Sequence, residues 1–150
     1  MKLRECYETY HRDLISVLFH YCGNTQEAEE MVQDVFIKYF EQQEQLENHP
    51  NIKAWLMRAG INLCFDRKRH WKVVLRHLHF LKGMEHAQSD PVEIASTLQV
   101  ALNKLDSRTK MAVILKYMEE YSYQEISQMM SLPEGSVKSM VSRGLSKIEG

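Results

Sequence analysis

The chain has 150 residues, 44% of them hydrophobic, and a formal net charge of −1. This length suits one ordinary domain or two small helical lobes, and the near-zero charge argues against a protein that coats nucleic acid with its whole surface. We expect a cytoplasmic protein without membrane insertion, because the start lacks the apolar segment of a signal peptide and no apolar run approaches membrane-spanning length.

Charge is distributed unevenly along the chain. Residues 1–50 carry ten acidic and four basic side chains, whereas residues 51–83 carry eight basic side chains and one acidic side chain, Asp66. This asymmetry is typical of a protein with an acidic surface for a partner and a basic surface for a polyanion. Solvated faces of ordinary helices are the alternative interpretation of each charge run.

Catalysis and metal binding have little support in the sequence. Cys6, Cys22 and Cys64 are odd in number and lack C-x-x-C spacing, so we expect buried thiols rather than a disulfide framework or a zinc knuckle. The four histidines between residues 70 and 86 are expected to be solvated linker residues. No Gly-rich phosphate loop, HExxH motif or nucleophile elbow occurs. We therefore expect no catalytic residue, no metal, no cofactor and no small-molecule substrate.

Apolar residues recur at helical spacing through nearly the whole chain, which predicts an all-α protein. The first helix is expected to end at Gly23, and Asn24 is expected to cap the second. Tyr7 of the first helix and Phe40 of the second are predicted to face the core. Residues 42–51 are polar and predict a loop, and a third helix completes the bundle from about Ile52.

A second group of helices is predicted after residue 90. Asp90 followed by Pro91 is a helix start, and Ser122 with Glu125 forms a capping box further on. Helical periodicity weakens between residues 71 and 89, where linker residues are expected. We predict a helical domain at 1–75, a flexible linker at 76–90 and a second helical domain at 91–150.

Residues 122–148 have the pattern of a helix-turn-helix unit. Leu132 is the apolar residue of the turn, and Val137 and Val141 are expected to seat the last helix on its lobe. The opposite side presents short polar and cationic side chains that can bond base edges and phosphates in a major groove. The side chains that we predict to face duplex DNA are Ser136, Lys138, Ser139, Ser142, Arg143 and Lys147. A helical hairpin with a solvated face is the alternative.

The basic middle of the chain predicts a second nucleic-acid surface. Arg58, Asn62, Asp66 and Arg69 are spaced by four, four and three residues, so they line one helix face. Amide and guanidinium groups beside a polar loop suit unstacked bases better than a closed duplex. The predicted contacts are the loop residues Asn48 and His49, the helix residues Arg58 and Asn62, and the phosphate-binding cations Arg67, Lys68 and Arg69.

Four segments carry a more specific signal. They are ETYHRDLISVLFHYCGN, EAEEMVQDVFIKYF, IKAWLMRAGINLCFDRKR and YSYQEISQMMSLPEGSVKSMVSRGLSKI. In this order the chain resembles the extracytoplasmic-function group of bacterial sigma factors over nearly its whole length. The resemblance implies two small helical domains joined by a flexible linker: a sigma-2-like bundle of three to four helices and a sigma-4-like helix-turn-helix domain.

The resemblance also implies partners. Such proteins bind core RNA polymerase, direct it to promoter DNA, and are often held inactive by an anti-sigma protein. The second segment would dock on the clamp of the largest polymerase subunit through Gln33, Asp34, Phe36 and Lys38. The loop that ends at Asn51, together with Asn62, would capture the −10 region, and the last helix would read the −35 region.

Two positions depart from the pattern of this group in the last helix. Met140 stands where a basic residue is usual, and Gly144 stands where alanine is common. Glycine in a helix interior costs roughly 1 kcal/mol. Weaker phosphate attraction at the −35 region is the expected consequence of the missing cation.

Two other function classes are open. A stand-alone helix-turn-helix regulator would need only the terminal unit and would bind duplex DNA without polymerase, whereas a sigma factor would bind DNA weakly by itself. The stripe from Arg58 to Arg69 argues against that regulator, which has no use for a single-strand surface. A hydrolase or thiol enzyme built on Cys64 or a histidine is the remote third class.

Overall fold

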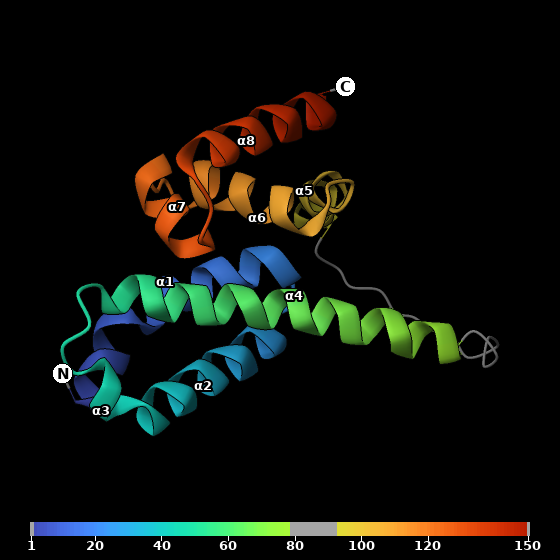
Figure 1. The fold of residues 1–150 in the computed structure, drawn as a ribbon. Helices are drawn as coiled ribbons and strands as arrows, with labels where there is room; N and C mark the ends of the chain where they lie inside the picture. Colours follow the sequence, from blue (N-terminus) through green and yellow to red (C-terminus); the bar gives the residue numbers. More distant parts are fainter. Residues whose placement is uncertain (1, 79–92, 150) are drawn as a thin grey trace.

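The computed structural model describes residues 2–78 and 93–149, and the side chains of residues 2–67 and 97–149. The described residues form helices and no strand, which confirms the predicted all-α class. Two helical lobes lie one above the other in Figure 1. The N-terminal lobe contains α1 (Leu3–Cys22), α2 (Thr25–Glu41), α3 (Gln43–Leu46) and α4 (Ile52–Leu78). The C-terminal lobe contains α5 (Glu93–Asn103), α6 (Ser107–Val113), the π-helical turn η2 (Ile114–Met118), α7 (Tyr123–Met130) and α8 (Glu134–Glu149).

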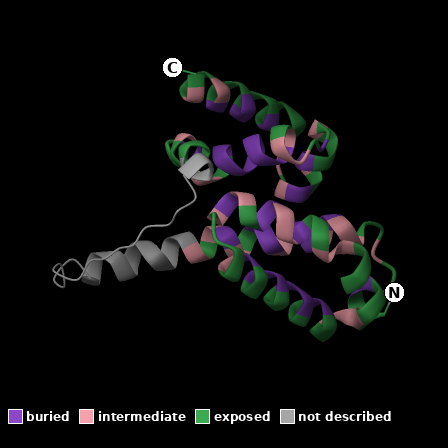
Figure 2. Cartoon of the chain, turned by 180° about the vertical axis from the view of Figure 1, so that it is seen from behind, coloured by how far each residue is buried: buried purple, intermediate pink, exposed green. Residues whose placement is uncertain are grey.

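In the N-terminal lobe, α1, α2 and α4 pack against one another in pairs. Gly23 ends α1 with a φ of 72°, and its N–H donates to the carbonyl of Phe19 over 2.7 Å. Asn24 then caps α2, because its Oδ1 accepts the N–H of Glu27 over 2.8 Å. These two neighbouring signals confirm the predicted turn between the first two helices. Figure 2 shows the buried residues on the inner sides of these helices.

In the C-terminal lobe, local caps fix the helix-turn-helix unit. The N–H of Glu125 donates to Ser122 Oγ over 3.1 Å, and the N–H of Ser122 donates to a carboxylate oxygen of Glu125 over 2.9 Å. This confirms the predicted capping box. Ser131 ends α7 in the left-handed region with a φ of 56°, so the chain turns sharply into α8. The π-helical turn η2 was not predicted.

Three details of the N-terminal lobe differ from the sequence prediction. The predicted polar loop contains the short helix α3, because buried Leu46 anchors it to the core. Tyr7 and Phe40 were predicted to face the core but are 42% and 58% exposed. The reason is that α4 packs on one side of the α1–α2 pair, and no described helix covers the other side. The predicted helix start at Asp90 lies outside the described residues.

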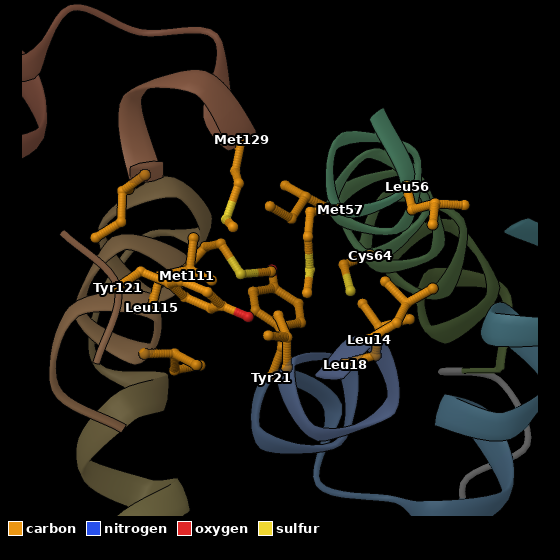
Figure 3. Packing of buried hydrophobic residues seen from close by; sticks show 14 of the residues in the cluster. Leu14, Leu18, Tyr21, Leu56, Met57, Cys64, Met111, Leu115, Tyr121 and Met129 are labelled. Carbon is orange, nitrogen blue, oxygen red and sulfur yellow. The ribbon is translucent and has the colours of Figure 1, made fainter. Parts of the chain in front are cut away.

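The two lobes share one hydrophobic cluster. In Figure 3, Met111, Leu115 and Met129 of the C-terminal lobe lie opposite Tyr21 and Met57 of the N-terminal lobe. All five side chains are buried. This contact between the lobes was not expected from the sequence, which predicted only a tether between them; the predicted domain boundaries themselves stay a prediction. Within the described residues, no helix has the length and apolar character that crossing a bilayer requires.

Asn24→Ala tests the turn between α1 and α2. The substitution removes the acceptor for the N–H of Glu27, so we expect the free energy of unfolding to fall by about 1 kcal/mol. Urea unfolding followed by circular dichroism measures it. Thr25→Ala, at the exposed next position, is the control and should change stability by less than about 0.5 kcal/mol. Equal losses in both variants would contradict the capping role.

Candidate promoter and polymerase interfaces

The outer side of α8 carries the side chains that the sequence predicted to face duplex DNA. All six are exposed: Ser136, Lys138, Ser139, Ser142, Arg143 and Lys147. On the inner side, Val137 and Val141 are buried, and α8 packs on α6 and α7. The helix therefore presents a continuous polar and cationic surface on a rigid support, which is the arrangement that a recognition helix needs.

Tyr123, at the start of α7, lies between two lysines. Lys116 Nζ is 4.4 Å from the centroid of the Tyr123 ring, and Lys138 Nζ is 5.7 Å from it. Cation–π attraction of this kind fixes both ammonium groups beside the outer side of α8. The sequence analysis missed Lys116 and Tyr123. Their positions in the sequence do not indicate that they lie near the last helix, because only the fold brings η2, α7 and α8 together.

The structure brings together some of the residues of the predicted single-strand surface. Asn62 is exposed on α4, and Asn48 is exposed in the preceding loop. His49 and Asn51 order that loop: His49 Nδ1 accepts the N–H of Asn51 over 3.0 Å. Asn51 Oδ1 accepts the N–H of Ala54 over 3.0 Å and so caps α4. The sequence analysis assigned Asn51 only to DNA and missed this capping role.

Two predicted residues of this surface are engaged by the C-terminal lobe. Asn51 Nδ2 donates to Gln128 Oε1 over 3.0 Å, and an Arg58 terminal N–H donates to the Gln128 carbonyl over 2.8 Å. Gln128 lies on α7, so these bonds join the two lobes. Trp55, near Arg58 on α4, packs against the core with its ring 6.2 Å from that of Tyr39, as expected of a core anchor.

Arg67 points away from Asn62 and toward α2. Its guanidinium lies 3.5 Å from a Glu30 carboxylate oxygen and 3.6 Å from an Asp34 carboxylate oxygen. The structure therefore does not bring Arg67 together with the rest of the predicted single-strand surface. Its pairing with Asp34 connects a predicted DNA residue with a predicted polymerase residue. The side chains of Lys68 and Arg69 lie outside the described residues.

An apolar groove runs along the outer side of α1 and α2. Phe36 forms part of its floor, is buried, and contacts Tyr7 edge-on with ring centroids 5.0 Å apart. Ile37 and Phe40 line it and are 57% and 58% exposed. Of the predicted docking residues, Gln33 also lines the groove, while Asp34 and Lys38 are exposed beside it. The sequence analysis missed Tyr7, Ile37 and Phe40 here because it assigned the first and last to the core and left Ile37 unassigned.

The geometry argues against a thiol enzyme. Cys64 is buried, and the loss of hydration raises the pKa of its thiol far above the ordinary value. Cys6 is also buried and Cys22 is partly buried, so the expectation of buried thiols is confirmed for two of the three. A neutral, enclosed thiol such as Cys64 is a poor nucleophile.

Two family models divide the chain as the two lobes do. Sigma-70 region 2 matches residues 6–72, and sigma-70 region 4 matches residues 95–148, so that together they span most of the sequence. This chain belongs to the sigma-70 family. The family is not a class of enzymes.

Relatives assign this sigma factor to the extracytoplasmic-function group. The ECF RNA polymerase sigma factor SigW of Bacillus subtilis is 26% identical over 152 residues, which cover 91% of this chain and 81% of SigW. SigX of the same organism is 24% identical over 150 residues, covering 93% of this chain and 77% of SigX. The chain is therefore a sigma factor, a protein that binds core RNA polymerase and promoter DNA.

Two solved structures share the fold. The sigma factor RpoE of Bartonella quintana, in complex with the anti-sigma factor NepR, aligns with a TM-score of 0.73 and 23% identity over 97% of this chain and 93% of that chain. CnrH, in complex with the cytosolic domain of CnrY, aligns with a TM-score of 0.72 and 16% identity over 98% of this chain and 84% of that chain. The likeness confirms the two-lobed helical fold.

The two departures in the last helix of this sigma factor have a packing explanation. A Cβ added at Gly144 would lie 2.8 Å from a methyl carbon of Thr109 and 2.8 Å from one of Val113. Glycine therefore lets α8 approach α6 more closely than alanine would. Met140 is only 8% exposed and belongs to the same hydrophobic cluster. Both positions support the helix on its lobe.

Gly144→Ala tests this close approach. The added methyl meets two β-branched side chains with restricted rotamers. Overpacking costs typically 1–3 kcal/mol, which exceeds the roughly 1 kcal/mol that alanine adds through helix propensity. We expect a lower free energy of unfolding in urea. Gly135→Ala is the matched control: no atom lies within 4 Å of its added Cβ, so it should not destabilise the protein. A fully stable Gly144→Ala variant would contradict the packing argument.

Proposed function

We propose that each lobe of this sigma factor carries out a separate recognition step at the promoter. The N-terminal lobe docks on the polymerase clamp and captures single-stranded −10 DNA, while α8 reads duplex DNA at the −35 region. The observation that carries this proposal is the continuous exposed surface of α8, which keeps all six predicted side chains available. The protein acts in the cytoplasm with polymerase and has no catalytic activity of its own.

The apolar groove on α1 and α2 is the proposed docking site for polymerase. Exposed Tyr7, Ile37 and Phe40 form a contiguous apolar surface, and such surfaces on small proteins mark binding sites. Gln33, Asp34 and Lys38 surround it with polar groups, which is the usual anatomy of a protein interface. An apolar segment of the clamp with polar side chains around it is the complementary partner.

Duplex recognition combines the six residues of α8 with the pair Lys116 and Tyr123. Lys138 and Arg143 are suited to guanine edges or phosphates, and Ser136 and Ser139 to phosphates. Lys116 adds a cation at the edge of this surface, held by the Tyr123 ring.

Control by an anti-sigma factor is the third part of the proposal. It is supported by the fold, which this chain shares with two sigma factors solved as complexes, one with the anti-sigma factor NepR and one with the cytosolic domain of CnrY. An anti-sigma factor that covers the apolar groove would compete with polymerase for the same exposed side chains.

The double substitution Ile37→Ala and Phe40→Ala tests polymerase docking. Each truncation removes exposed apolar area, so we expect affinity for core RNA polymerase to fall at least about tenfold. Biolayer interferometry with immobilised core enzyme measures it. Phe19→Ala removes an aromatic ring that is exposed elsewhere on α1 and should leave the affinity within about twofold. Unchanged binding by the double variant would reject the groove as the docking site.

Substitutions in the two lobes should affect different steps of initiation. With a promoter selected from genomic DNA by the reconstituted holoenzyme, Asn62→Ala should reduce strand opening, followed by permanganate footprinting, more than initial binding. Lys138→Ala and Lys116→Ala should weaken binding to duplex −35 DNA and reduce its salt dependence by about one released ion each. Lys104→Ala, an exposed cation after α5, is the control. Equal loss of binding and opening in Asn62→Ala would count against its proposed role.

A further inference from the structure

Three sulfur-containing side chains of the N-terminal lobe line one cavity. They are Cys22 at the end of α1, Met31 of α2 and Cys64 of α4. The cavity has a volume of about 410 Å³ and is also bordered by side chains of α5 and α6. Neither the apolar groove nor the proposed DNA surfaces use these three side chains, so the functions described above leave the cavity without a role.

The spacing of the sulfur atoms matches that of two ligands of one metal ion. Cys64 Sγ lies 4.0 Å from Met31 Sδ. Two sulfur ligands that each lie about 2.3 Å from an ion, at an angle of about 120°, are themselves about 4.0 Å apart. Cys22 is close to this pair: burial raises the pKa of the Cys64 thiol, and the charge of Cys22 raises it further. In Figure 3, Cys64 lies on the side of α4 that faces α1.

Cys22 is the side chain that admits the ion. It is partly exposed, and its thiol donates a hydrogen bond to the carbonyl of Asn24 over 3.3 Å. That bond requires the thiol proton, which is released to water when a metal ion takes the sulfur as a ligand. The Cys22 side chain then turns toward the other two sulfur atoms. Cys64 releases its proton in the same way, so each ion bound displaces two protons.

Lys110 balances the charge of such a site. A monovalent cation with two thiolates is an anion, and Lys110 lines the same cavity. Lys110 is only 5% exposed, and its Nζ lies 4.4 Å from the centroid of the Tyr21 ring. Attraction between a buried cation and a nearby anion is screened weakly. Glu27 also lines the cavity, but it is partly exposed, so water screens its charge more strongly.

The donor atoms select the class of ion. Thiolate and thioether sulfur are soft ligands that favour Cu(I), whereas zinc takes four ligands from cysteine, histidine and carboxylates. In the part of the chain that the structure describes, no three His, Cys, Asp or Glu side chains are placed to hold a metal ion. We propose that Cys22, Met31 and Cys64 form a binding site for Cu(I) that joins α1, α2 and α4. The sequence did not indicate this site, because its ligands come from three separate helices.

Anaerobic titration with Cu(I) buffered by bicinchoninate tests the site. Cys22→Ala removes a ligand at a partly exposed position, so the chain should stay folded and lose at least about tenfold in Cu(I) affinity. Met31→Leu, which conserves side-chain volume, should also bind Cu(I) more weakly. Cys6→Ala is the matched control, because Cys6 is a buried thiol outside the cavity, and it should keep the wild-type affinity. Equal affinities of wild type and Cys22→Ala would overturn the proposal.

Urea unfolding with and without Cu(I) distinguishes a site built by the fold from thiols that bind copper in any conformation. A ligand that binds the folded chain preferentially raises the midpoint of unfolding, and binding to the unfolded chain opposes this effect. We expect Cu(I) to raise the midpoint of wild type and Cys6→Ala, and to raise that of Cys22→Ala less. A wild-type midpoint that Cu(I) lowers or leaves unchanged would show that the fold builds no such site. Circular dichroism without metal checks that each variant is folded.

Discussion

The burial of apolar side chains between the lobes is the interaction on which the rest of this structure depends. Small domains bury a smaller fraction of their surface than large ones and are correspondingly marginal in stability. Here each lobe completes its core with the other: Tyr21 and Met57 on one side meet Met111 and Met129 on the other. The arrangement of every proposed surface follows from this contact, because it decides which helix faces remain accessible to partners.

The side chains that stay outside the shared core fall into two chemical classes. Ile37 and Phe40 are large apolar side chains on a helix whose inner side is already filled. Their exposure is unfavourable for the isolated chain and useful only to a partner. By contrast, the polar side chains of α8 are stable in water and do not require a partner to be satisfied. The two proposed recognition surfaces therefore differ in kind: one gains from burial, and the other from charge and hydrogen bonding.

Local signals in the sequence predicted the helices and their ends well. Gly23, Asn24 and Ser122 end or cap helices through hydrogen bonds to residues only three or four positions away. These caps could therefore be predicted directly from the sequence. The exposed side of α8 could be predicted for the same reason, from its 3.6-residue period. Contacts between distant segments could not. Arg67 has the charge and position of a DNA-binding residue, yet Glu30 and Asp34 on α2 hold it. Nothing in the neighbourhood of Arg67 along the chain signals that pairing.

Tyr7, Phe40 and Lys116 illustrate the same limit. Periodicity indicates that an apolar residue belongs to one face of a helix. Whether that face is buried depends on which other helices pack against it. Lys116 joins the proposed DNA surface because η2 places it over the Tyr123 ring, and a π-helical turn has no simple sequence signature.

The absence of a side chain at Gly144 restricts which substitutions the proposed recognition helix α8 tolerates. Because α6 fills the space where a Cβ would lie, a larger residue at that position would push α8 away from α6, although the position lies in the helix proposed to read DNA. On the proposed function, substitutions that change promoter preference are therefore expected at the solvent side, for example at Ser139 and Ser142, which are exposed and small enough to be replaced by longer side chains. Such substitutions would change the contacts of α8 and leave its packing on α6 as it is.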